Sequence, residues 1–106
     1  MIFIELTPFV AFRESHWTDE TFSRLQRFLL ATPDVGDLIR GGGGLRKVRW
    51  LVHGRGKRSG ARVIYYWDVP ADRIYLVYGY TKARQTDLTT RQLKTLQSLL
   101  GDLPHG

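Results

Sequence analysis

Residues 61–80 read ARVIYYWDVPADRIYLVYGY. This stretch contains two runs rich in β-branched and aromatic residues, Ala61–Trp67 and Arg73–Tyr80, separated by the short segment DVPAD. Valine, isoleucine and tyrosine favour strands, and a polar segment with a proline between two such runs favours a turn. The stretch therefore predicts two strands joined as an antiparallel hairpin.

A third strand is predicted just before this hairpin. Residues 45–52 read LRKVRWLV, and the bend VHGRGKRSGAR at 52–62 connects them to the next strand. The glycine run GGGG at 41–44 leads into this strand and not into a helix. We therefore interpret the run as a hinge and not as a phosphate-binding loop.

Helical patterns flank the three strands. After the short strand IFIEL at 2–6 and a short helix at TPFVAFRES, 7–15, Thr18 is placed to cap a helix whose apolar stripe is Phe22, Leu25, Phe28 and Leu29. Near the end, DLTTRQLKTLQSLLG carries Thr89 and Gln92 at capping-box spacing. We predict an α+β fold in which an antiparallel sheet has an N-terminal helical hairpin on one face, followed by a C-terminal helix, all in one domain of residues 1–106.

The strand pairing predicts which residues share a face. If the first hairpin is centred on Arg55-Gly56 and the second on DVPAD, Arg49 lies directly opposite Arg62. One face is then a core, and the other is cationic and aromatic. The predicted core face holds Val48, Trp50, Val52, Ala61, Val63, Tyr65, Trp67, Ile74, Leu76, Tyr78 and Tyr80. The predicted cationic face holds Lys47, Arg49, Arg62, Ile64, Tyr66, Tyr75, Val77 and Gly79.

Positive charge is concentrated in the middle of the chain. The net charge is +6, yet residues 38–67 hold eight basic and no acidic residues, whereas residues 1–37 hold three basic and six acidic ones. Such a block favours an anionic partner, most simply nucleic acid, over an ordinary solvated surface. There is no cysteine, no apolar run of membrane-spanning length and no export signal, so we expect a soluble, cytoplasmic protein without disulfides.

The segments GGLRKVRW, GRGKRSGARVIYYW and IYLVYGYTKARQTDLT resemble the HigB branch of the RelE/ParE toxin superfamily over roughly residues 34–100. The resemblance implies the RelE-like fold and the toxin of a type II toxin–antitoxin system. It also implies cleavage of mRNA in the A site of the 70S ribosome, and neutralisation by a tightly bound antitoxin, commonly a helix-turn-helix protein of the HigA kind, in a toxin–antitoxin hetero-oligomer. No cofactor is expected.

Site residues follow from the same motifs. The resemblance places the reaction on a basic set of four: Lys47, Arg49, Arg62 and Lys82. Contacts to RNA or the ribosome are expected from Arg46, Arg55, Lys57, Arg58, Tyr66, Tyr80 and Arg84. Better-studied RelE toxins place a tyrosine just after the last strand, where this chain has Asp87-Leu88, so Tyr80 and Tyr66 are the candidates to replace it.

The roles in proton transfer stay open. Arginine suits the phosphoryl oxygens because its guanidinium donates in a fork and stays charged. Lys47, crowded by Arg49, would lose a proton more readily and could serve as base or proton donor, and Lys82 is equally eligible. His53 is a rival, although a histidine flanking a loop is the simpler interpretation. Because no histidine pair has metal-ligand spacing, no metal is expected.

Two other function classes remain open on sequence grounds. The same basic face could belong to a module that binds RNA or the ribosome without cutting. The superfamily also contains ParE-like gyrase inhibitors, which cleave nothing, although these usually lack such a face. Only cleavage yields discrete new mRNA ends, so mapping those ends separates the first hypothesis from both alternatives.

Overall fold

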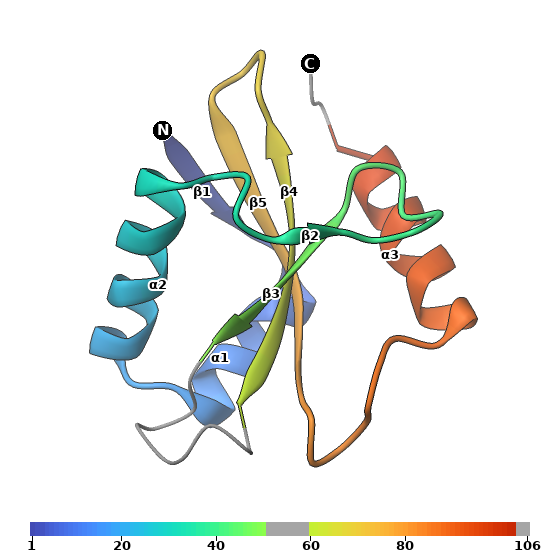
Figure 1. The fold of residues 1–106 in the computed structure, drawn as a ribbon, viewed down its shortest axis with the longest axis horizontal. Helices are drawn as coiled ribbons and strands as arrows, with labels where there is room; N and C mark the ends of the chain where they lie inside the picture. Colours follow the sequence, from blue (N-terminus) through green and yellow to red (C-terminus); the bar gives the residue numbers. More distant parts are fainter. Residues whose placement is uncertain (51–59, 104–106) are drawn as a thin grey trace.

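The computed structural model describes residues 1–50 and 60–103 and shows an α+β fold, which confirms the predicted class (Figure 1). Its elements in chain order are β1 (Ile2–Glu5), α1 (Thr7–His16), α2 (Asp19–Ala31), β2 (Asp37–Leu38), β3 (Arg46–Trp50), β4 (Ala61–Asp68), β5 (Arg73–Thr81) and α3 (Thr90–Gly101). The strands form one sheet in the order β1-β5-β4-β3-β2. The predicted bend centred on Arg55 and the predicted strand end at Val52 lie outside the described residues.

The sheet is mixed and not purely antiparallel as predicted. Strands β2 to β5 run antiparallel to their neighbours, but β1 pairs with β5 in parallel. Short turns force neighbouring strands to run antiparallel, whereas two helices separate β1 from the next strand and leave its direction free. The parallel pairing continues past the end of β1, because the Leu6 amide donates to the Leu76 carbonyl at 2.9 Å.

The β4–β5 hairpin contains a bulge that the sequence analysis missed. From Asp68↔Arg73 to Tyr65↔Leu76 the pairing follows the prediction, but Ile64 then pairs with Tyr78, so Val77 is an additional residue on β5. Because side chains alternate along a strand, one added residue reverses the faces of all that follow. Tyr78 and Tyr80 were predicted on the face covered by α1 and α2 but lie on the α3 side. Gly79 was predicted on the α3 side but faces α1.

Gly79 shows this reversal directly. A Cβ at this position would overlap Cδ2 of Phe12, so α1 packs against the bare backbone of β5. The residue opposite Arg62 is consequently Tyr80 and not Gly79. The bulge thus places an aromatic hydroxyl beside the basic strands.

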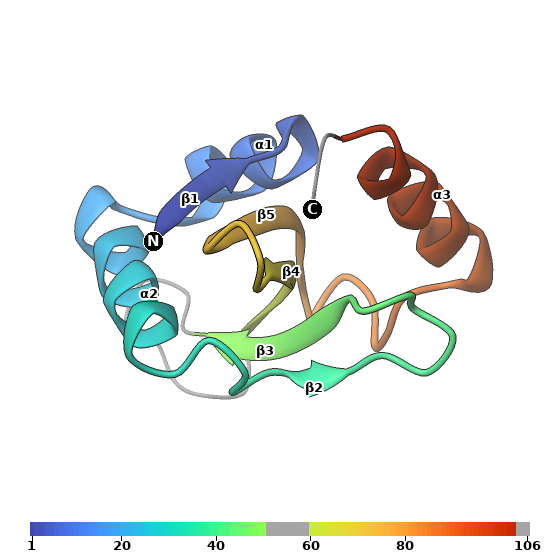
Figure 2. The same ribbon diagram turned by 90° about the horizontal axis from the view of Figure 1, so that it is seen from above.

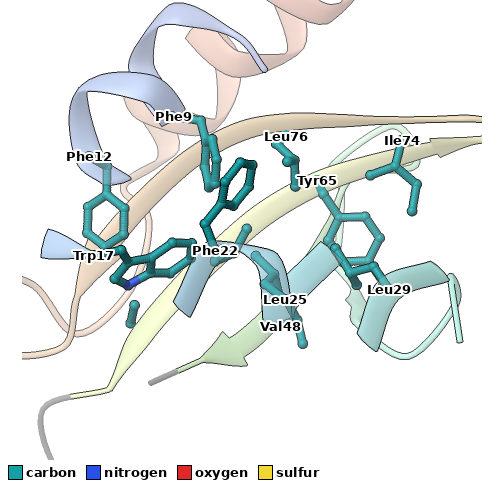
Figure 3. Close-up of a cluster of buried hydrophobic side chains, with 12 residues drawn as sticks. Phe9, Phe12, Trp17, Phe22, Leu25, Leu29, Val48, Tyr65, Ile74 and Leu76 are labelled. Carbon is teal, nitrogen blue, oxygen red and sulfur yellow. The ribbon is translucent and has the colours of Figure 1, made fainter. Parts of the chain in front are cut away.

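Both faces of the sheet carry a core. Helices α1 and α2 bury Phe9, Phe12, Phe22, Leu25 and Leu29 against Val48, Val63, Tyr65, Ile74 and Leu76 (Figure 3). On the other face, Leu96 and Leu100 of α3 pack with Leu45, Ile64, Tyr75 and Val77. Figure 2 shows α3 on its own side, away from α1 and α2. The face predicted to be cationic and aromatic is therefore, over part of its area, a second core.

The helix starts follow the predicted signals. The Thr18 side chain accepts from the Thr21 amide at the start of α2, and Thr89 and Gln92 form a complete capping box at the start of α3. These contacts satisfy amide groups that would otherwise lack a partner in the first turn. None of the described helices is both long enough and apolar enough to cross a bilayer.

Tyr65 ties the segment after α2 to the sheet. Its side chain is fully buried, its hydroxyl donates to the Pro33 carbonyl at 2.7 Å, and it accepts from the Gly36 amide at 2.9 Å. Gly36 must be small here, since a Cβ would lie 2.7 Å from the Tyr65 ring. The contact leads the chain into β2, which then pairs with β3 at Asp37↔Lys47.

Candidate active site

Three of the predicted basic residues lie together on the α3 side of the sheet. Val48 is buried toward α1 and α2, so its neighbours Lys47 and Arg49 on β3 point to the opposite side. Arg62 on β4 points there for the same reason, and Arg49 pairs directly with Arg62, as predicted. Helix α3 packs over a different part of this face, so Arg49 stays exposed and Arg62 and Lys47 are half-exposed.

A carboxylate joins this basic group. Asp87 lies in the loop between β5 and α3, and its Oδ1 accepts from three donors. These are Lys47 Nζ at 3.2 Å, the Tyr80 hydroxyl at 3.4 Å and the Leu88 amide at 2.8 Å. Lys47 was expected to be crowded by cations, and the structure adds the carboxylate of Asp87, which forms an ion pair with it.

The contacts around Asp87 set two protonation states. The hydrogen bond from the Leu88 amide lowers the pKa of Asp87 most, and the hydrogen bond and charge of Lys47 lower it further. Asp87 is therefore an anion near neutral pH. Burial raises the pKa of Tyr80 to about 12, and the charge of Asp87 adds to the rise. Tyr80 consequently keeps its proton and acts as a donor.

A groove opens beside Lys47 and Asp87, with a volume of about 360 Å³. The segment around β2 and the start of α3 form its walls. Its other lining residues are Asp37, Leu38, Ile39, Arg40, Leu88, Thr89, Thr90 and Leu93. The lining mixes the apolar Leu38, Ile39, Leu88 and Leu93 with charged and hydroxyl side chains, so the groove is more polar than a typical small-molecule pocket.

The structure separates other predicted residues from this group. Arg46 lies on the α2 side, where its guanidinium donates to the carbonyls of Asp34 at 3.1 Å and Gly36 at 2.8 Å. Tyr66 shares the face of Arg62 but stands two alternations along β4, roughly 13 Å away at the usual rise of a strand. There its ring contacts Tyr75, with centroids 6.3 Å apart. The two residues pair directly across β4 and β5, so this is an ordinary cross-strand aromatic pair.

Lys82 and Arg84 follow the end of β5 and are exposed. The Lys82 amide donates to the Gly60 carbonyl at 3.3 Å. This bond places Lys82 at the open end of the β4–β5 hairpin, where β4 begins and β5 ends. Arg84 instead lines a separate hollow of about 250 Å³ that also includes Phe12, His16 and Gly79. Arg55, Lys57, Arg58 and His53 lie outside the described residues, so their predicted roles stay predictions.

The sequence analysis did not include Asp87 among the site residues. It noted Asp87-Leu88 only as the place where a tyrosine was missing. A possible signal was the position itself, since Asp87 is the one acidic residue between Asp72 and the end of α3 at Gly101. Within residues 1–50 and 60–103, no three histidine, aspartate or glutamate side chains come together as a metal ion would require.

These features define a class: a small α+β domain that presents arginine and lysine side chains from adjacent strands, beside a tyrosine hydroxyl, as a surface suited to a phosphodiester. The chain belongs to the RelE family, described as the RelE toxin of the RelE/RelB toxin–antitoxin system, whose match covers residues 35–104. The match spans β2 to α3 and with them every residue of the group around Asp87. The protein is thus the toxin of a toxin–antitoxin pair, and its partner is an antitoxin.

Proposed function

We propose that this toxin, of the HigB type, is a metal-independent endoribonuclease that cuts mRNA in the ribosomal A site. The observation that carries the proposal is the direct cross-strand pair of Arg49 and Arg62, with Lys47 on the same face. Membership of the RelE family supports it, because toxins of this family are in general endoribonucleases.

The arginine pair is unfavourable unless an anion joins it. Like charges directly opposite in a sheet are destabilising by up to ~1 kcal/mol. A phosphate bound between two guanidinium groups replaces that repulsion by charge-assisted hydrogen bonds. The side-chain alternation of β3 and β4 therefore places Arg49 and Arg62 side by side, where they can bind an anion.

The proposed reaction is an attack by a ribose 2′-hydroxyl on the adjacent phosphorus. The bond from O2′ to phosphorus forms and the bond from phosphorus to O5′ breaks, so the products are a 2′,3′-cyclic phosphate and a free 5′-hydroxyl. A base takes the proton from O2′, and O5′ receives one as it leaves. Arg62 and Arg49 stabilise the charge that grows on the phosphoryl oxygens.

The contacts of the site favour one assignment for Lys47. Its ion pair with Asp87 supports an ammonium that supplies positive charge or a proton for the leaving O5′, and not a base. Tyr80 keeps its proton and is not the base either. Lys82 remains eligible for a proton-transfer role because it is exposed at the end of β5.

A ribosome-bound substrate fits a site without an obvious strong base. If the ribosome orders the mRNA, the toxin supplies mainly charge and positioning, and free RNA is a poor substrate. Arg55, Lys57 and Arg58 are proposed to contact ribosomal RNA, which would make the affinity salt-sensitive. We further propose a cytoplasmic protein, held inactive in a hetero-oligomer by a helix-turn-helix antitoxin of the HigA kind.

The test is cleavage of a defined mRNA by purified toxin, with and without programmed 70S ribosomes, with the new ends mapped by primer extension. We expect cuts within the A-site codon only when ribosomes are present. We expect Arg62→Ala to lose at least about 100-fold in rate, the scale seen when one donor to a developing oxyanion is removed. Arg27→Ala is the matched control, because Arg27 is exposed on α2 and its side chain bonds only to Ser23 among the described residues.

Each outcome discriminates between the candidate functions. A folded Arg62→Ala protein that cleaves as fast as Arg27→Ala would refute the assignment of the site. Binding to ribosomes without cuts would instead support a module that docks on RNA. Inhibition of DNA supercoiling without cuts would support a ParE-like gyrase inhibitor.

A further inference from the structure

Asp87 connects parts of the chain that are far apart. Its Oδ1 is the common acceptor of a lysine on β3, a tyrosine on β5 and the amide that follows it in the loop before α3. Forty residues separate Asp87 from Lys47 in the chain. One carboxylate oxygen therefore joins β3, β5 and the loop before α3.

The Leu88 amide gives the carboxylate a fixed direction. At 2.8 Å it is the shortest of the three bonds, and it comes from backbone that also leads into the capping box of α3. A long lysine side chain has no such support, because four rotatable bonds separate its ammonium from the strand. Bonding to Asp87 restricts that ammonium, and two of its three N–H donors remain for a substrate.

We propose that Asp87 is a positioning residue for the cleavage reaction, holding the Lys47 ammonium and the Tyr80 hydroxyl at one point beside Arg62. The proposal rests on the proposed function, since it concerns the rate of that reaction. Asp87 makes no contact with the reacting atoms in this assignment and acts through its two partners. Without it, Lys47 loses its fixed geometry while its charge remains.

The variant that tests this role is Asp87→Asn. It preserves the shape of the side chain and an oxygen for the Leu88 amide, and it removes the negative charge that holds Lys47. The matched control is Asp102→Asn, the same change at an exposed position just after α3. Both proteins are assayed as the full chain on programmed 70S ribosomes, at saturating toxin and in a single turnover.

Asp87→Asn should lower the cleavage rate constant without lowering the affinity for mRNA on the ribosome. We expect Asp87→Asn to lower the cleavage rate constant by about 10- to 100-fold, as for a misplaced catalytic group, and Asp102→Asn to leave it unchanged. Affinity is measured with an mRNA that carries 2′-deoxyribose at the cleavage position and lacks the nucleophile. Because a negative charge has been removed next to cations, this affinity should be equal to or higher than that of wild type.

A double-mutant cycle tests the route through the lysine. If Asp87 acts through Lys47, Asp87→Asn should lower the rate less in a Lys47→Ala background than in wild type. Equal and additive losses in the two backgrounds would refute that route. A fall in both rate and affinity would show a general structural role in place of positioning.

Failure of this inference is distinguishable from failure of the proposed function. If wild type cleaves and Asp87→Asn cleaves as fast, the positioning role is wrong and the function stands. If wild type leaves every mRNA intact on ribosomes it binds, the proposed function is wrong, and a role for Asp87 in cleavage is refuted with it.

Discussion

Replacing Tyr65 by phenylalanine removes one oxygen from the interior of the protein. That oxygen donates to the Pro33 carbonyl and accepts from the Gly36 amide, and the ring that carries it is fully buried. Phenylalanine fills almost the same space, so the ring keeps its place against α2. The change therefore isolates the two hydrogen bonds.

The structure gives the size of the effect. The bond to the Gly36 amide is buried, and a buried donor left without a partner costs about 1–3 kcal/mol. The Pro33 carbonyl is only partly buried, so water replaces its lost partner in part, and this loss is nearer ~0.5 kcal/mol. We expect Tyr65→Phe to lower the free energy of unfolding by about 1.5–3.5 kcal/mol and the Tm by roughly 10 °C.

The assay is urea unfolding followed by tryptophan fluorescence, with the m-value checked for constancy. Tyr78→Phe is the matched control, because its hydroxyl is half-exposed and accepts from Gln92 Nε2 at 3.3 Å. A loss below ~1 kcal/mol is expected there. If Tyr65→Phe were no less stable than Tyr78→Phe, the claim that this hydroxyl anchors the segment after α2 would be refuted.

Three further predictions concern single positions. Thr89→Ala should cost about 1 kcal/mol of stability through loss of the capping box, measured by urea unfolding, and Thr89→Ser should restore most of it. Gly79→Ala should cost about 1–3 kcal/mol in the same assay because its methyl group overlaps the Phe12 ring, and an equal stability would contradict that close approach. The pKa of Asp87 is lowered in the folded state, so its contribution is present above the ordinary carboxylate pKa and is lost as pH falls through the lowered value. Asp87→Asn should therefore flatten the acid side of a plot of Tm against pH. The corresponding change in the free energy of unfolding should be below ~1 kcal/mol, because the side chain is 64% exposed.

Local patterns predicted most of the elements. Thr18 and Thr89 marked helix starts because a cap and its partner lie within four residues in the sequence. The DVPAD turn fixed the register of β4 and β5 from Asp68↔Arg73 to Tyr65↔Leu76, and alternation along β3 predicted that Lys47 and Arg49 share a face. In each case the deciding interaction is between residues close in sequence or in one strand pair.

The missed features depend on distant contacts. Val77 is an ordinary strand residue, and nothing in its neighbours shows that β4 leaves it unpaired. The direction of β1 is set by its place beside β5, after two helices have intervened. Asp87 meets Lys47 only because the loop before α3 passes over β3. These contacts join residues far apart in the chain, and no local sequence pattern predicts them. The basic residues of the site were therefore predicted without the carboxylate of Asp87.

The additional residue on β5 has a consequence for variation among related chains. Deleting Val77 would remove the bulge and leave Tyr80 opposite Arg62, because Leu76 and Tyr78 would then alternate regularly opposite Tyr65 and Ile64. The hydrophobic character of the strand would barely change. In relatives of this toxin, a strand that is one residue shorter here should therefore build the same site with a regular ladder, whereas a chain that keeps the residue needs the bulge to place its tyrosine beside Asp87.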